Sequence, residues 1–301
     1  MPHSLETVEK IKRKHGLSGD AAPLALSGDV NEPWSIGDEF ILRINRREEC
    51  DDEAAREALV VPLVRAAGIR TPELIACSYE ADIVPRPYTI YRRAPGVLLG
   101  NLDIDPTTVS RLHREIGREL ALLHRMEVPK ELTNAHAPWG FKPTEQIQKA
   151  REAEKFTDEE VQDMHAWMNE ISRAMGEPKL ESLIHKDIHP WNLMVDPNTF
   201  ELTSILDWGD SMSGDVASDF ASMPLVAVPH MLQGYAEAGE KVDNSLIAKS
   251  LYNGLGLAAW ELRCGTPDTY RRQWWRMPVG GWEETKQFVS ANFPEILHSV
   301  P

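Results

Sequence analysis

The chain has 301 residues, of which 42% are hydrophobic and 26% charged, and its formal net charge is −15. This length requires one large or two modest domains. The negative charge disfavours broad contact with nucleic acid, which needs a basic surface. No apolar run approaches the ~18 residues that cross a bilayer, and residues 1–19 lack the apolar block of a signal peptide. The three cysteines form no motif, so we expect a reduced, cytoplasmic protein with no membrane or nucleic-acid partner.

Acidic residues are concentrated in the second part of the chain. Residues 1–97 carry 13 basic and 16 acidic side chains, whereas residues 98–301 carry 19 and 31. Such a surplus can attract a cationic small molecule by focusing the electric field. It can equally serve as a surface charge that keeps a protein soluble, and composition alone does not separate the two interpretations.

The first part of the chain mixes strand and helix patterns. Short apolar runs alternate with turn residues from Leu24 to Ile44, which predicts a strand at 24–26, a loop and at least one hairpin. The segment from Asp51 to Ala67 begins with acidic residues and is followed by glycine, as a helix would be, and Pro62 is expected to kink or break it. Two further strands are predicted at 72–77 and 88–91.

The second part is mainly helical. Asp105 followed by proline predicts a helix start, and Thr157 with Glu160 predicts a capping box before an apolar stripe. A further helix is predicted at 246–260, and residues 94–96 (Ala-Pro-Gly) are expected to form a hinge between two lobes. Together these patterns predict an α+β fold with a mixed first part.

One segment of the helical part alternates as strands do. The runs 193–195 and 202–206 flank an Asp-Pro-Asn turn and predict a hairpin. A hairpin pairs residues equidistant from its turn, so Asn192 and Asp207 are expected to meet at its open end. Asp187 lies five residues before Asn192, in a loop that a proline keeps out of helix. Two carboxylates and an amide oxygen are therefore expected at one rim.

This set of side chains suits phosphoryl transfer. Hard oxygen ligands hold Mg²⁺ against nucleotide phosphates, and a further carboxylate orients the attacking hydroxyl. The spacing His-x-Asp-x-x-x-x-Asn followed by Asp-x-Gly is the catalytic-loop and metal-binding pattern of kinases. Here it occupies residues 185–192 and 207–209.

With these motifs the chain resembles the aminoglycoside phosphotransferase family over roughly residues 24–220, including Gly-Asp at 214–215 and Asp-Phe-Ala at 219–221. The resemblance implies a bilobal protein-kinase-like α+β fold. Residues 1–93 would form a small nucleotide-binding lobe with an antiparallel sheet, and residues 94–301 a larger, mainly helical lobe for catalysis and substrate binding. It also implies a kinase that uses Mg²⁺ and transfers the γ-phosphate of ATP or GTP to a substrate hydroxyl.

The resemblance also implies roles for single residues. Asp187 would be the catalytic aspartate, and Asn192 and Asp207 would hold the metal. Arg43 stands where the family has a phosphate-binding lysine or arginine, with Glu57 as its expected ion-pair partner; a guanidinium can bridge phosphate and carboxylate. Support of the loop is expected from His185, Asp215 and Asp219, and contact with the nucleotide from Ser27, Arg43, Glu57, Tyr91, Arg93 and Ala94.

Two departures from the family pattern stand out. The expected phosphate-covering loop at residues 27–34 has a single glycine and no Gly-x-Gly-x-x-Gly. Lys186 replaces a glycine that is usual in the family.

Other interpretations remain at this point. His185, Asp187 and His189 could share one face and bind zinc, but no further ligand follows at a zinc-like spacing. A protein kinase is disfavoured because no Ala-Pro-Glu follows Asp207 and the segment after it is short. An inactive nucleotide-binding module is a third alternative.

The acceptor is left open. The acidic second part favours a cationic, hydroxylated acceptor such as an aminoglycoside. Macrolides, choline, homoserine and sugars are alternatives, as are ATP and GTP for the donor and monomer or homodimer for the assembly. We expect residues 127–182 and 223–301 to build the acceptor pocket. The tryptophans crowded near the C-terminus are expected to pack in the core or to line this pocket.

Overall fold

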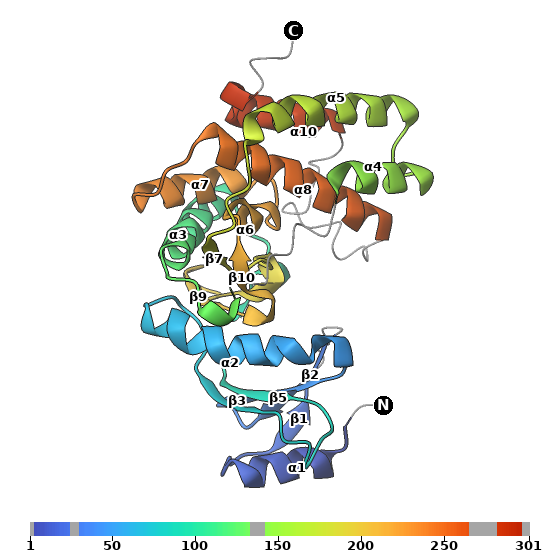
Figure 1. Cartoon of the computed structure of the whole chain (residues 1–301). Coiled ribbons are helices and arrows are strands. Elements are labelled where there is room, and N and C mark those ends of the chain that lie inside the picture. Colours follow the sequence, from blue (N-terminus) through green and yellow to red (C-terminus); the bar gives the residue numbers. More distant parts are fainter. Residues whose placement is uncertain (1–2, 25–29, 133–141, 265–281, 297–301) are drawn as a thin grey trace.

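A computed structural model describes residues 3–24, 30–132, 142–264 and 282–296. A five-stranded sheet with two helices occupies one end of the molecule, and a mainly helical part occupies the other (Figure 1). The predicted α+β architecture is confirmed. No helix in these four ranges is long and apolar enough to span a bilayer.

The sheet of the N-terminal part is antiparallel, with strand order β1-β2-β3-β5-β4. It lies between the helices α1 and α2 (Figure 1). The predicted hairpin is present, with Ile36 paired to Phe40. The elements are α1 (Leu5–Lys14), β1 (Ala21–Pro23), β2 (Asn31–Ile36), β3 (Phe40–Asn45), α2 (Asp51–Ala66), β4 (Leu74–Ser78) and β5 (Tyr88–Arg92).

One prediction for this region needs correction, and another falls partly outside the described residues. The first strand of the structure lies at residues 21–23, and residues 25 and 26 of the strand predicted at 24–26 lie outside the described residues. The last four residues of the expected phosphate loop, 31–34, already belong to β2, where all four pair with β3 and Trp34 also pairs with Pro23 of β1. Backbone pairing with two neighbours therefore outweighs the local turn propensity of this stretch. Ser27, within this expected loop, lies outside the described residues.

Helix α2 continues through Pro62 without the predicted break. Val60, Val61 and Val64 are completely buried in the core of the C-terminal part. Their burial outweighs the lost backbone hydrogen bond of a proline, because most helical stability in proteins comes from tertiary packing.

The C-terminal part surrounds two small antiparallel sheets, β6-β8-β9 and β7-β10, with helices. The predicted caps are present: Asp105 accepts from the backbone of Thr107 and Thr108, and Thr157 and Glu160 form a capping box. The elements are β6 (Val97–Leu98), α3 (Pro106–His124), α4 (Pro143–Glu152), α5 (Asp158–Met175), β7 (Ser182–Ile184), β8 (Leu193–Val195), β9 (Leu202–Ile205), β10 (Met212–Gly214), α6 (Ala217–Ala221), α7 (Val228–Glu237), α8 (Asn244–Cys264) and α10 (Trp282–Asn292). Short 3-10 turns occur at η1 (Glu48–Cys50), η2 (Leu99–Asn101), η3 (Lys130–Leu132), η4 (Pro190–Asn192), η5 (Trp208–Asp210) and η6 (Pro294–Ile296).

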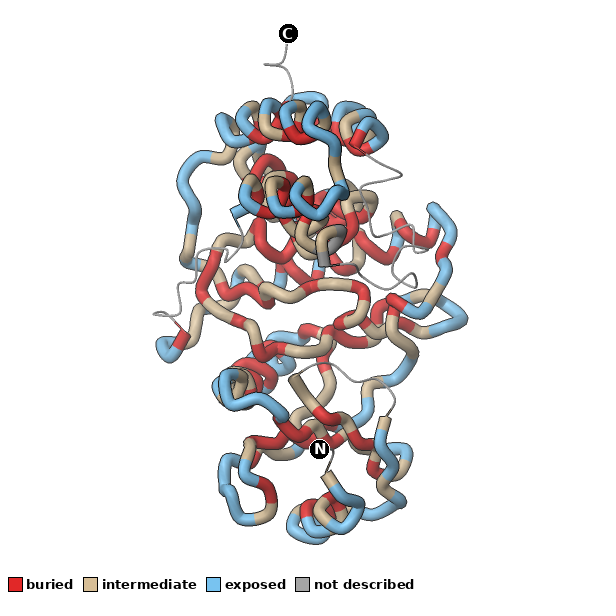
Figure 2. The backbone as a smooth tube through the Cα atoms, turned by 90° about the vertical axis from the view of Figure 1, so that its right-hand side faces the viewer, coloured by how far each residue is buried: buried red, intermediate tan, exposed pale blue. Residues whose placement is uncertain are grey.

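Buried residues run through the middle of the molecule, and exposed ones lie on its outer turns (Figure 2). The large core joins the helices, the two small sheets and one face of α2. A separate small core lies between α1 and the sheet. Helix α2 therefore links the N-terminal sheet to the core of the C-terminal part.

Helices α3 and α7 approach closely at two glycines. A Cβ atom on Gly117 would lie 2.0 Å from the carbonyl oxygen of Met231, and one on Gly234 would lie 1.9 Å from that of Arg114. Only glycine permits backbones to meet at this distance.

We expect Gly117→Ala to lower the free energy of unfolding by about 1–3 kcal/mol through overpacking. In an unconstrained helix the same change would raise it by about 1 kcal/mol. Denaturant unfolding checks the sign, with Ser110→Ala on α3 as a control that should be neutral or slightly stabilising. Stabilisation by Gly117→Ala would contradict the close approach.

Candidate active site

The loop after β7 has a strained backbone that its surroundings hold in place. Lys186 adopts a φ of 72°, in the left-handed region where a side chain costs about 1–2 kcal/mol and glycine nothing. The completely buried Asp219, on α6, accepts hydrogen bonds from the backbone N–H groups of His185 (2.9 Å) and Lys186 (2.6 Å). The Nε2 atom of His124 lies 3.0 Å from the same carboxylate. These three contacts hold the loop conformation.

His185 connects the loop to the hairpin. Its Nε2–H donates to the carbonyl oxygen of Leu206 at 2.9 Å, and its Nδ1 accepts from the backbone N–H of Asp187 at 3.3 Å. The ring is buried, with its centroid 4.6 Å from that of Trp208. Because both ring nitrogens are engaged, His185 is not free to bind zinc as the alternative interpretation requires. Within the described ranges, no three His, Cys, Asp or Glu side chains gather as metal ligands.

Asp187 is held between His189 and Asn192. His189 Nδ1 accepts from the backbone N–H of Trp191, which leaves Nε2–H to donate to Asp187 Oδ2 at 3.3 Å. Asn192 Nδ2 donates to the same Oδ2 at 2.9 Å. Burial raises the pKa of Asp187, but the contacts with His189, His185 and Asn192 outweigh it, and the pKa lies below its ordinary value. The side chain is 41% exposed, so an ionised oxygen remains accessible to a substrate.

The hairpin register differs by one residue from the symmetric pairing expected from the sequence. At the open end Leu193 pairs with Ile205, beyond a bulge between Met194 and Val195, and the backbone N–H of Leu206 donates to the carbonyl oxygen of Asn192 at 2.8 Å. Asp207 follows one residue later with a φ of 64°. Asn192 and Asp207 still lie at the same open end, but Asp207 reaches it by a left-handed turn rather than by direct pairing.

Arg43 joins the N-terminal sheet to this hairpin. One guanidinium nitrogen lies 2.6 Å from Glu57 Oε1 and the other 2.9 Å from Asp207 Oδ1. The Tyr91 hydroxyl donates to Glu57 Oε2 at 2.7 Å. Burial raises the pKa of Glu57, although Arg43 opposes the change. Burial also raises the pKa of Asp207, but the charge of Arg43 outweighs it and the pKa of Asp207 is lowered.

This geometry agrees with the family to which the sequence is similar. Residues 26–249 match the model of a family described as the phosphotransferase enzyme family. The chain belongs to this family.

Solved structures of similar fold include aminoglycoside phosphotransferases. The GDP complex of aminoglycoside 2'-phosphotransferase-IIIa is 17% identical, with a TM-score of 0.62, and the similarity covers 97% of this chain and 100% of that one. The GDP and kanamycin complex of APH(2")-IIIa is 18% identical, with a TM-score of 0.61 and coverage of 96% and 100%. The streptomycin–ATP complex of APH(2")-IIa is 15% identical, with a TM-score of 0.59 and coverage of 91% and 98%. These similarities confirm the expected bilobal kinase-like fold.

A curated relative is much longer than this phosphotransferase. The mouse (Mus musculus) acyl-CoA dehydrogenase family member 10 is 20% identical over 173 residues, which make up 55% of this chain but only 16% of that protein. The chain thus corresponds to a small share of that relative's length.

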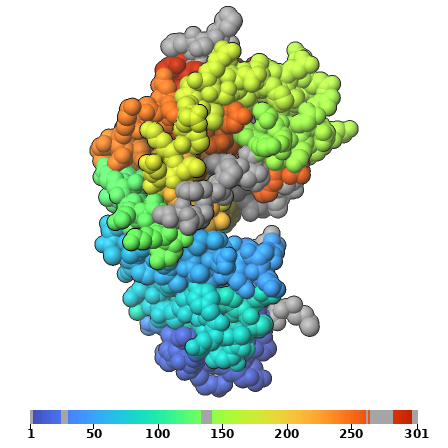
Figure 3. All heavy atoms as spheres, in the orientation of Figure 1, coloured from blue at the N-terminus to red at the C-terminus, as the bar shows by residue number. Residues whose placement is uncertain are grey.

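The remaining nucleotide-binding predictions lie around β5 of the phosphotransferase. Tyr91 is buried and directs its hydroxyl to Glu57 rather than outward. The backbone N–H of Arg93 donates to the carbonyl oxygen of Glu39 at 2.6 Å. Ala94 is half-buried where the chain leaves the sheet. On one side the surface is hollowed between the N-terminal and C-terminal parts (Figure 3).

The structure adds three residues to the site, of which the sequence had named only His189, as a possible zinc ligand. His189 contacts Asp187, and His124 contacts Asp219. The predicted support residue Asp215 accepts from the Nζ of Lys249 at 2.7 Å, and that lysine is almost fully buried. A lone lysine in the apolar stripe of α8 was a sequence signal for Lys249, because buried lysines are normally paired. No comparable signal marked His124.

Oxygen atoms at the rim suit Mg²⁺. Both hydrogen bonds of the Asn192 amide to Asp187 use Nδ2, which leaves Oδ1 as a ligand. Arg43 pairs with Oδ1 of Asp207, and the Asp207 side chain is 39% exposed. Carboxylate and amide oxygens are the ligands that Mg²⁺ prefers, so Asn192 and Asp207 fit the ion that the family implies.

We expect Tyr91→Phe to raise the KM for the nucleotide several-fold and to lower the free energy of unfolding by about 1–3 kcal/mol. Loss of the hydroxyl leaves a buried oxygen of Glu57 short of a partner and loosens Arg43. Tyr88→Phe is the matched control, because the Tyr88 hydroxyl lies on the same strand but 2.8 Å from His15. Equal KM values for both variants would contradict this role.

We expect His189→Asn to move the acid limb of the kcat/KM profile to higher pH. Asparagine can still cap η4, but the contact that lowers the pKa of Asp187 is lost while the effect of burial remains. Activity that needs ionised Asp187 is then lost earlier as pH falls. Rate profiles measured against His230→Asn, a change on α7, check this. An acid limb that does not move would show that His189 does not set this pKa.

Proposed function

We propose that this phosphotransferase is a Mg²⁺-dependent small-molecule kinase that transfers the γ-phosphate of ATP or GTP to a substrate hydroxyl. The observation that carries the proposal is the ion pair between Arg43 and Asp207 beside the exposed carboxylate of Asp187. It combines a cation for phosphate, an oxygen ligand for a metal and a group that can receive a proton.

Each residue has a distinct role in the proposed reaction. Ionised Asp187 accepts or orients the proton of the attacking hydroxyl. Asn192 and Asp207 would hold Mg²⁺, which neutralises phosphate charge when bound. Arg43 neutralises further charge, and Glu57 with Tyr91 fixes its direction. The lowered pKa of Asp187 supports its part, because the carboxylate stays ionised at neutral pH.

The donor and the cellular setting are also proposals. The solved relatives include complexes with GDP and with ATP, which supports a nucleoside triphosphate without choosing the base. Cys50 and Cys77 are free thiols, which fits a reducing cytoplasm. The monomer or homodimer assembly stays a prediction.

The acceptor is a small hydroxylated molecule in this proposal. Kanamycin and streptomycin are present in two of the solved relatives, which supports an aminoglycoside as one candidate. A macrolide, choline, homoserine and a sugar are the others.

We expect Asp187→Asn to lower kcat by about a hundred- to ten-thousandfold, because the group that receives the proton is lost. Chelation of Mg²⁺ should stop turnover of the wild type, and added Mg²⁺ should restore it. A coupled assay of nucleotide consumption over the candidate acceptors measures both effects.

Asp196→Asn, at the turn end of the same hairpin, is the matched control and should leave kcat unchanged, since asparagine preserves the turn. Undiminished turnover in folded Asp187→Asn would refute the assignment of Asp187.

A further inference from the structure

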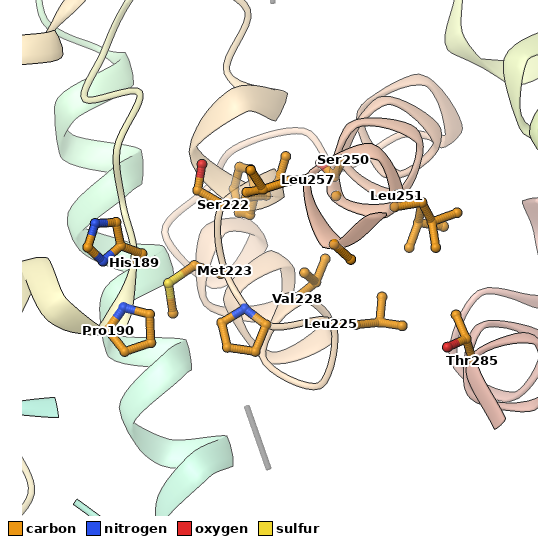
Figure 4. Close-up of a pocket in the computed structure, with 16 residues that line it drawn as sticks. His189, Pro190, Ser222, Met223, Leu225, Val228, Ser250, Leu251, Leu257 and Thr285 are labelled. Carbon is orange, nitrogen blue, oxygen red and sulfur yellow. The ribbon is translucent and has the colours of Figure 1, made fainter. Parts of the chain in front are cut away.

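A pocket opens directly beside Asp187. Its volume is about 640 Å³, including space open to solvent, and His189 and Pro190 stand at one side of it (Figure 4). Asp187 does not itself line the pocket, but His189 does, and its Nε2 is 3.3 Å from Asp187 Oδ2, so this residue links the pocket to the proposed catalytic carboxylate. Its other walls come from the segment between α6 and α7, from α8 and from α10. A hydroxyl at Asp187 would leave the rest of its molecule in this space.

The part of the pocket wall that the structure describes is largely uncharged. Its 16 residues include His189 but no Asp, Glu, Lys or Arg. Most are aliphatic side chains, including Met223, Leu225, Val228 and Leu251. Among the few polar groups, the Ser250 hydroxyl already donates to the carbonyl oxygen of Leu246 at 2.8 Å. The pocket therefore favours an apolar occupant.

This lining opposes the charge argument made from the sequence. The acidic surplus of residues 98–301 does not supply a carboxylate to the described wall of the pocket. Apart from the nearby Asp187, the described wall offers a polycationic acceptor no carboxylate to pair with, and burying unpaired charge is strongly unfavourable. An apolar molecule gains free energy in the same place.

Apolar space continues behind the pocket. A second, smaller pocket of about 310 Å³, including space open to solvent, is lined by residues that include Met164, Met168 and Trp282. It shares Leu255 and Ala258 of α8 with the first pocket. Among the described residues these two are the ones common to both linings, and both are half-buried. Small movements of Leu255 would lengthen the apolar site for an extended occupant.

We infer that the acceptor is an uncharged alcohol with an extended apolar body, which lies in this pocket while its hydroxyl meets Asp187. The inference rests on the proposed kinase function for the reaction. The alcohol oxygen forms a bond to the γ-phosphorus, and the bond from that phosphorus to the bridging oxygen breaks. The nucleoside diphosphate leaves with the electron pair, and the hydroxyl proton passes to Asp187 and then to solvent.

The first test is a series of straight-chain alcohols from butan-1-ol to octan-1-ol, with kanamycin as the cationic comparison. We expect kcat/KM to rise roughly fourfold for each added methylene, on the order of a hundredfold across the series. Octan-1-ol should be preferred to kanamycin. A flat series, or a preference for kanamycin, would overturn the inference.

A matched pair of variants tests the site. Leu225 lines the pocket, whereas its neighbour Val226 is equally half-buried but does not. We expect Leu225→Asp to lower kcat/KM for octan-1-ol at least tenfold and to flatten the series, and Val226→Asp to change it less than twofold. Equal effects of the two variants would overturn the assignment of the pocket.

A binding measurement separates the inference from the proposed function. Equilibrium dialysis measures the binding of octan-1-ol and butan-1-ol to the full chain without turnover. It is done with the wild type in the presence of a non-hydrolysable ATP analogue, and with the Asp187→Asn variant. If octan-1-ol binds more tightly than butan-1-ol and Leu225→Asp abolishes the difference, the pocket is supported. If no alcohol is then phosphorylated, the kinase proposal fails alone. Turnover of another acceptor with no difference in alcohol binding rejects the pocket and leaves the kinase proposal standing.

Discussion

The ion pair between Arg43 and Asp207 connects the two parts of the molecule at the point where the chemistry is proposed. Arg43 is on the central part of the sheet and Asp207 is beyond the hairpin, 164 residues later in the chain. Arg43 is 17% exposed and Asp207 39% exposed, while Glu57, the second partner of Arg43, is only 3% exposed. Removing one member of such a set leaves an uncompensated charge, which is far more unfavourable than losing a surface ion pair. Through Glu57 the same contacts reach α2 and the Tyr91 hydroxyl, so one connected set of side chains joins the sheet, α2 and the end of the hairpin.

Two residues near this ion pair have a strained backbone. Lys186 and Asp207 both adopt left-handed conformations that L-residues rarely take, and each is close to a buried partner that holds it. Asp219 accepts backbone hydrogen bonds from His185 and Lys186 and so holds Lys186 in place. Arg43 holds Asp207 by pairing with the Asp207 carboxylate. Strained residues of this kind persist only where surrounding contacts determine them, and they cluster at functional sites. The hydrogen bonds to Asp219 explain why a lysine is tolerated at residue 186, where glycine would be unstrained.

In the proposed reaction, phosphate chemistry and acceptor recognition use different physical forces. The rim of Asp187, Asn192 and Asp207 is charged and offers oxygen ligands, whereas the adjoining pocket is lined by aliphatic side chains from α7, α8 and the segment before them. His189 belongs to both, because it contacts Asp187 and lines the pocket. The net charge of a region therefore says little about its binding site, since acidic side chains on an outer surface contribute nothing to an apolar interior wall.

The sequence by itself determined the α+β class, the helix caps at Asp105 and Thr157, and the open end of the hairpin where Asn192 and Asp207 meet. These features depend on residues close together in the chain, through hydrogen bonds of caps and turns and through the alternation of strands. Only the tertiary structure decided the continuity of α2 through Pro62, the bulge in the hairpin, the contacts of His124 with Asp219, and the absence of Asp, Glu, Lys and Arg from the described pocket wall. Each of these results from burial against segments distant in sequence, and local patterns do not report which distant side chains a residue will meet.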